Sequence, residues 1–150
     1  MEQIKLFFSN PILIGTLLSW FVAQGTKVLM VLLSKKKLDI TRLYGAGGMP
    51  SSHSSLVSTL VILVARVDGV GATSFAIALA FAVIVMYDAA GVRRAAGEQA
   101  KRINILIEEW VNRSNGKMDE KLKELLGHTP FEVIMGALLG ILIGYLYPIY

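Results

Sequence analysis

Long stretches without charge alternate along the chain with short segments in which polar residues gather. Residues 6–26 are uncharged, and the apolar pattern continues beyond Lys27, which predicts a first membrane-spanning helix over residues 11–33. Residues 69–87 are also uncharged and predict a further span over residues 70–90. Both runs are long enough to cross the apolar core of a bilayer.

Two shorter apolar runs predict further helices. One covers residues 52–67, with Arg66 at its far end, and it is short for a span. It is interpreted as a span, and a re-entrant or buried helix is the alternative. The other begins at Thr129 and Pro130, which suit an N-cap and a first helical turn, and it continues to about Tyr147.

The segment over residues 93–127 has a different pattern, because charged positions interrupt the apolar ones. Apolar residues recur there at helical spacing, at Ile103, Leu106, Ile107, Trp110 and Val111. This predicts an amphipathic helix that lies at the membrane interface or packs on the domain. A turn at Asn115-Gly116 is followed by a second short helix with Leu122, Leu125 and Leu126 on one side.

Composition supports a membrane protein. Of the 150 residues, 54% are hydrophobic and 17% are charged, whereas soluble domains average about 25% charged residues. We therefore expect one all-α domain over residues 1–150, an integral membrane bundle of about four spans with a cytoplasmic amphipathic segment. The chain has no cysteine, which excludes disulfides and cysteine-ligated zinc.

The basic residues are distributed unequally between the two predicted sides. One side holds Lys5 and Arg66, and the other holds Lys35, Lys36, Lys37, Arg42, Arg93, Arg94, Lys101, Arg102, Arg113, Lys117, Lys121 and Lys123. By the positive-inside rule the richer side faces the cytoplasm, in a plasma membrane of bacterial type. The net charge of +4 is then explained by topology, and nucleic acid is not an expected partner.

The two histidines of the chain, His53 and His128, both fall on the predicted cytoplasmic side, each at the start of an apolar helix. Glycines and the Pro50-Ser51-Ser52 segment precede His53. Backbone N–H groups at such a helix start are suited to binding phosphate. An ordinary loop and N-cap is the alternative interpretation.

Glu132 follows His128 by four residues, so one helical turn can bring the two side chains together. A carboxylate that accepts the N–H of one imidazole nitrogen leaves the other nitrogen free as a nucleophile. A capping contact at the helix start is the alternative.

Several cations lie on the same side as these histidines. Lys35 and Arg42 precede the His53 segment and are candidates for holding phosphate oxygens. Asp88 ends a predicted span and is followed by Arg93 and Arg94. We expect Asp88 to pair with one of these arginines, and one of them to reach the phosphate.

Together these motifs resemble the three-part signature of the type 2 phosphatidic acid phosphatase superfamily, which includes the vanadium haloperoxidases. The resemblance covers residues 35–133 and is greatest to a small divergent bacterial and plastid branch. It rests on Lys35 with Arg42, on Gly48-Met49-Pro50-Ser51-Ser52-His53, on the Asp88-to-Gly97 segment, and on Gly127-His128-Thr129-Pro130 with Glu132.

The resemblance implies a role for each residue. His128 would attack phosphorus, Glu132 would orient it, and His53 would protonate the leaving alkoxide. The phosphate oxygens would be held by Lys35, Arg42, and the backbone around Ser51 and Ser52, and that mechanism requires no metal or cofactor.

The leading hypothesis is therefore a phosphatase for a lipid phosphate at the cytoplasmic face, with phosphatidylglycerophosphate or phosphatidate as the substrate. Lys121 and Leu122 stand where the family has Ser-Arg, which favours the alternative of a non-catalytic lipid-phosphate binder or scaffold. An undecaprenyl-pyrophosphate phosphatase is a further alternative, and a vanadate-dependent oxidase has only distant analogy behind it. Gly136, Gly140 and Gly144 form a small-residue face that packs within the bundle or against a second copy, so a homodimer is expected.

Overall fold

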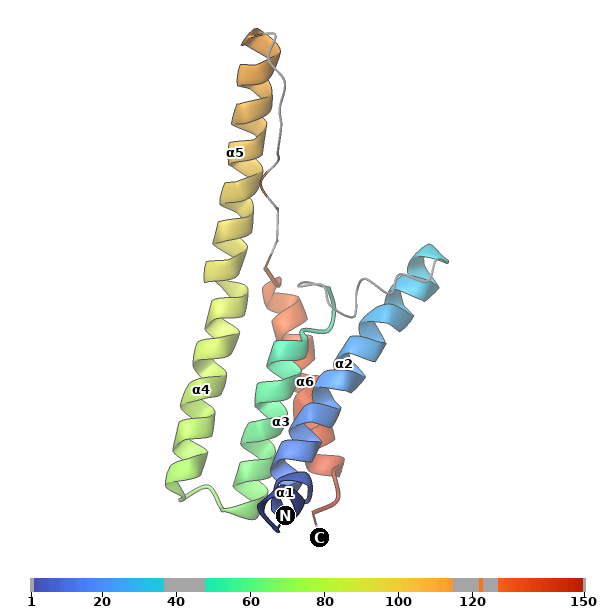
Figure 1. Ribbon diagram of the computed structural model, residues 1–150, viewed down its shortest axis with the longest axis vertical. Coiled ribbons are helices and arrows are strands. Elements are labelled where there is room, and N and C mark those ends of the chain that lie inside the picture. The colour runs from blue at the N-terminus through green and yellow to red at the C-terminus, as the bar shows by residue number, and fades with distance from the viewer. Residues whose placement is uncertain (1, 37–47, 115–121, 123–126, 150) are drawn as a thin grey trace.

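The computed structural model describes residues 2–36, 48–114, 122 and 127–149. Within these residues the regular structure is entirely helical. The helices are α1 (Glu2–Phe8), α2 (Pro11–Lys35), α3 (Ser52–Val67), α4 (Thr73–Ala90), α5 (Val92–Ser114) and α6 (Pro130–Leu146) (Figure 1). The four predicted apolar helices are confirmed to within a few residues, whereas α1 was not expected.

Four helices, α2, α3, α4 and α6, run up and down beside one another, and α3 packs against the other three (Figure 1). The C-terminal ends of α2 and α4 lie at the same end of the bundle as the starts of α3 and α6. The Asp68–Gly69 turn connects α3 to α4 at the opposite end, with Gly69 at a φ of +87°. Because α3 runs from one end of the bundle to the other, it is a central antiparallel helix and does not re-enter on its own side.

The helices differ in length relative to a bilayer. At 25 residues, α2 measures about 37 Å, and α4 is also long and apolar enough to cross a membrane. The 16 residues of α3 and the 17 of α6 span about 24 and 25 Å, somewhat less than a hydrocarbon core of about 30 Å. The two shorter helices are apolar and lie against the longer ones, as expected of a helical membrane protein.

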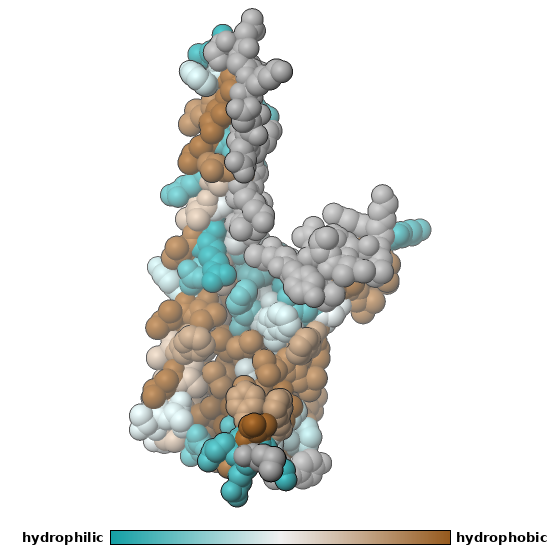
Figure 2. Space-filling view, in the orientation of Figure 1, coloured by the Kyte–Doolittle hydropathy of each residue, from teal (hydrophilic) through white to brown (hydrophobic). Residues whose placement is uncertain are grey.

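The centre of the bundle holds small polar side chains beside apolar ones such as Val57 and Leu63. Small hydroxyl side chains are buried at the centre, where Ser19 Oγ lies 2.7 Å from both Ser55 Oγ and Thr59 Oγ1. Large apolar side chains face outward instead, among them Ile77, Ile84, Tyr87, Leu138 and Leu142. In Figure 2 the apolar residues cover the visible surface of the bundle between hydrophilic residues near its two ends. Such a surface matches lipid better than water.

The glycines of α6 allow it to approach α3 closely. A Cβ atom on Gly136 would clash with the carbonyl oxygen of Ser51, and one on Gly140 with that of Ser55. Thr59 Oγ1 also donates to the Gly140 carbonyl at 2.8 Å. The predicted small-residue face therefore packs within the bundle. The expected homodimer remains a prediction, and this face no longer supports it.

The amphipathic helix α5 is placed differently from the expectation. It continues the direction of α4 beyond the ends of α3 and α6, after an irregular residue at Gly91 (Figure 1). The residues directly beyond Gly91 include good helix formers such as Arg93, Arg94, Ala95 and Ala96, so the chain resumes a helix. Leu122 lies beside α5, where its backbone N–H and C=O both bond to the Asn104 amide at 2.8 Å. Leu122 is not helical, and the rest of the predicted second short helix lies outside the described residues.

Candidate active site

The first turn of α3 places His53 at the end of the bundle where α4 passes into α5. Ser51 is the N-cap of α3, and its Oγ accepts hydrogen bonds from the N–H of Ser54 at 3.3 Å and from the Ser54 hydroxyl at 3.0 Å. The Ser51 N–H donates to the carbonyl of Glu132 at 3.0 Å. The start of α3 is thereby attached to the first turn of α6.

His128 is held from the other side of the same site. Its backbone N–H donates to the Ala89 carbonyl at 3.2 Å, which attaches the segment before α6 to the end of α4. A side chain at Gly127 would clash with the backbone of Arg93 and Arg94, so only glycine allows this approach. The His128 side chain is consequently buried.

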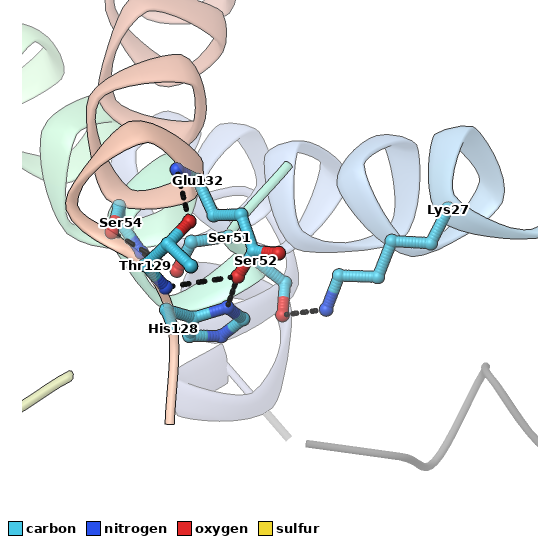
Figure 3. A network of polar contacts seen from close by, with 7 residues as sticks. All are labelled: Lys27, Ser51, Ser52, Ser54, His128, Thr129 and Glu132. Carbon is cyan, nitrogen blue, oxygen red and sulfur yellow. Dashed lines mark hydrogen bonds and ion pairs between the residues drawn. The ribbon is translucent and has the colours of Figure 1, made fainter. Parts of the chain in front are cut away.

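The two histidine rings lie beside each other in an edge-to-face arrangement, with centroids 6.1 Å apart and planes inclined at 62°. Glu132 Oε2 lies 3.1 Å from His128 Nδ1 and accepts the Thr129 N–H at the same distance, while Thr129 Oγ1 accepts the Glu132 N–H (Figure 3). Glu132 therefore both orients the imidazole and completes a capping box, so the two interpretations of the sequence hold together. With Nδ1–H donated to the carboxylate, Nε2 of His128 keeps its lone pair.

The surroundings of His128 favour its neutral form. Burial lowers the pKa of His128 below its ordinary value, and the positive charges of Lys27 and Arg93 lower that pKa further. The hydrogen bond and the charge of Glu132 act in the opposite direction. A neutral imidazole is the form that can attack phosphorus.

Asp88 and Arg93 form the wall of the site beyond His53. Arg93 Nε donates to Asp88 Oδ2 at 2.6 Å, and this confirms the expected pairing. Both residues line a cavity of about 230 Å³ together with His53 and parts of α4. Arg94 is exposed and is not among the residues that line this cavity, because neighbouring positions on a helix point in directions about 100° apart.

Comparison with known proteins places the chain in a family. Residues 8–143 match the divergent PAP2 family. The chain belongs to the divergent PAP2 family. It is also 43% identical over 145 residues to the uncharacterized membrane protein YuiD of Bacillus subtilis (strain 168), with 90% of this chain and 92% of that protein covered. No solved structure matches the chain significantly.

Membership of the divergent PAP2 family confirms the resemblance seen in the motifs, while the individual site residues remain predictions. Arg42 lies outside the described residues, as does the side chain of Lys35 at the end of α2. Ser51 and Ser52 are buried in the site, although the Ser51 N–H is used by Glu132. Among the residues that the structure describes, no group of three or more His, Cys, Asp or Glu side chains is placed to hold a metal ion.

Lys27 belongs to this site of the divergent PAP2 protein and was not among the predicted site residues. It is buried within α2, and its Nζ donates to Ser52 Oγ at 3.2 Å (Figure 3). The signal in the sequence is a single lysine inside an otherwise uncharged span, since such residues usually face a functional interior.

Proposed function

We propose that this protein is a lipid phosphate phosphatase that forms a phosphohistidine on His128. One observation carries the proposal: the two histidines, 75 residues apart in the sequence, have ring centroids 6.1 Å apart, and Glu132 holds Nδ1 of the one that would attack. A nucleophile, its orienting carboxylate and a proton donor at one end of the bundle are the groups that such a transfer needs.

The reaction proceeds in two balanced steps. Nε2 of His128 attacks phosphorus, the bond from phosphorus to the lipid oxygen breaks, and His53 gives its proton to that oxygen so that the lipid leaves as an alcohol. Water then attacks the phosphohistidine and His53 accepts a proton from it, which regenerates neutral His128 and releases inorganic phosphate. Phosphoryl transfer depends mainly on positioning and on neutralising the phosphate oxygens, and the cations beside the histidines would do this.

An apolar cavity further along the bundle supports a lipid substrate. It measures about 210 Å³ between α3, α4 and α6, and it is lined by Ser58, Val61, Ile62, Leu79, Ala82, Met86, Ala137 and Ile141. On α3 and α6 these residues lie one to three turns beyond the site residues, as Ser58 lies beyond His53, and on α4 they precede Asp88. A lipid chain in this cavity would leave its phosphate at the histidines.

The proposed substrate is phosphatidylglycerophosphate or phosphatidate, which fits a site at the cytoplasmic face. The charge asymmetry of the sequence supports that orientation, because the end of the bundle with the histidines is also the end with most lysines and arginines. Undecaprenyl pyrophosphate stays the alternative substrate, and it would fit an outward-facing site better.

Phosphate release by the purified full-length protein tests the proposal, measured on a panel of lipid phosphates in detergent with EDTA present. We expect wild type to release phosphate, His128→Ala to lose at least about 10³-fold in rate, and His53→Ala to lose about 10²- to 10⁴-fold. Arg113→Ala, at the exposed end of α5, is the control and should match wild type. Unchanged release by His128→Ala would contradict the mechanism.

A second candidate is a lipid-phosphate binder without catalysis. Leu122 supports it, because the superfamily has arginine there, and the Asn104 amide holds the backbone of this uncharged residue beside α5. In the same assay a binder would retain anionic lipid and release no phosphate, with His128→Ala indistinguishable from wild type.

A further inference from the structure

Lys27 is a buried cation in a helix that would lie within the membrane. Its side chain is only 3% exposed, and the preceding residues 6–26 of the chain carry no charge. A charged side chain at membrane depth costs about 3 kcal/mol on insertion scales or more, so it is usually paired or faces a functional interior.

The contacts of Lys27 point to a ligand that is not a protein carboxylate. Its Nζ donates to the hydroxyl of Ser52, which is uncharged and immediately precedes His53. Over residues 2–36, 48–114, 122 and 127–149, Lys27 forms no ion pair with a carboxylate, although Glu132 is near enough to attract it. The neighbouring cation Arg93 differs, because Asp88 already pairs with it at 2.6 Å.

The position of Lys27 is also suitable for contact with a phosphoryl group. Figure 3 shows its side chain extending from α2 toward Ser52, on the side of the site where His128 and Glu132 lie. Ser52, which accepts the hydrogen bond from Lys27 Nζ, directly precedes His53, and the His53 ring lies 6.1 Å from the ring of His128. Lys35 lies about two turns beyond Lys27 on α2, about 12 Å from it along the helix axis.

We propose that Lys27 is the phosphate-binding cation of this site, with its ammonium group on a non-bridging oxygen and the Ser52 hydroxyl as a second donor. When phosphate is absent, the Ser52 hydroxyl accepts a hydrogen bond from the ammonium group of Lys27. When phosphate binds, a phosphate oxygen replaces the hydroxyl as the acceptor of that hydrogen bond. The identity of the bound phosphate as substrate rests on the proposed function, whereas the binding itself does not.

Binding of inorganic phosphate to the full-length protein in detergent tests this inference separately from catalysis. Titration calorimetry and the rise in unfolding temperature with phosphate are measured for wild type, Lys27→Met, Lys27→Arg and Lys36→Met. We expect Lys27→Met to weaken phosphate binding at least tenfold, Lys27→Arg to retain part of it, and the exposed Lys36→Met to match wild type. On the best lipid, Lys27→Met should raise KM as well as lower kcat, because phosphate is held in the ground state too.

The outcomes separate the two proposals. If wild type binds phosphate through Lys27 but hydrolyses no lipid, this inference stands and the proposed function fails. If folded Lys27→Met binds phosphate and turns over lipid as wild type does, Lys27 is structural and this inference is overturned. If Lys27→Met does not fold, phosphate binding is measured for Ser52→Ala instead. Unchanged phosphate affinity of Ser52→Ala would overturn the inference, because Ser52 is proposed to share the phosphate site with Lys27.

Discussion

At the scale of single residues, Glu132 combines a structural and a chemical role. One carboxylate oxygen of Glu132 accepts the N–H of Thr129, which is the N-cap of α6, and also contacts Nδ1 of His128. The capping box thus sets the direction of the imidazole, because the carboxylate that takes part in the cap is also the group that contacts Nδ1 of His128. Any substitution at Glu132 is therefore expected to affect both helix stability and the tautomer of His128.

The pH profile of the reaction tests the role of Glu132. Neutral His128 is the reactive form and its pKa lies below the ordinary value of about 6.5, so the acid limb of the activity should lie below that value. Glu132 raises this pKa, and Glu132→Gln should therefore move the acid limb of kcat/KM to still lower pH. The rate at neutral pH should also fall, by about tenfold or more, because the tautomer is no longer held. An acid limb that stays in place or moves upward would argue against this role.

At the scale of the helices, contact between α3 and α6 positions the site. Gly136 lies against Ser51 and Gly140 against Ser55, so the backbone of α6 rests on the segment that carries His53. Glu132 lies in the first turn of α6 and His128 directly precedes its N-cap, so the separation of α3 and α6 influences the distance between the histidines. Packing and chemistry are coupled at this interface.

Gly140→Ala should therefore lower both stability and activity. The added methyl group would clash with the Ser55 carbonyl and force α6 away from α3, at a cost of about 1–3 kcal/mol. Gly25→Ala in α2 is the matched control, because nothing lies within 4 Å of a Cβ there. Thermal unfolding in detergent should show a lower midpoint for Gly140→Ala, and an unchanged or slightly higher one for Gly25→Ala. Equal midpoints for the two variants would mean that the close contact is not needed.

At the scale of the whole molecule, the two ends of the bundle differ in charge and in chemistry. Both histidines, Lys27 and Arg93 lie near the end from which α5 extends. At the other end, Arg66 donates to the carbonyls of Gly144, Tyr145 and Tyr147 at 2.7–3.1 Å, where α6 finishes. The orientation of the bundle in the membrane therefore decides which leaflet supplies the substrate.

The natural chain has no cysteine, so a single cysteine introduced by substitution can be labelled selectively. Labelling of such variants can establish this orientation directly. Val70→Cys is exposed at the turn before α4, and Arg113→Cys is exposed near the end of α5. In intact cells a membrane-impermeant maleimide should label Val70→Cys, and it should label Arg113→Cys only after lysis. The reverse pattern would place the site on the outer face and favour undecaprenyl pyrophosphate as the substrate.

The sequence alone determined the four apolar helices to within a few residues. Uncharged runs of about 20 residues cannot be dissolved in water as isolated segments, so apolar spans over 11–33 and 70–90 follow from composition. The pairing of His128 with Glu132 was equally predictable, because both lie within one helical turn of a local cap. The nearness of His53 to His128 followed from the antiparallel order of the spans and from the family motifs.

Tertiary structure alone decided what depends on the rotation and direction of whole helices. Lys27 faces Ser52 because α2 packs on α3 in one rotational setting, and a uniformly apolar span contains little pattern from which that setting can be inferred. The choice of Arg93 over Arg94, and the extension of α5 beyond the bundle, depend in the same way on how the chain passes Gly91. Local chemistry is encoded within one turn of helix, whereas the assembly of the site from α2, α3, α4 and α6 requires contacts between residues far apart in the sequence.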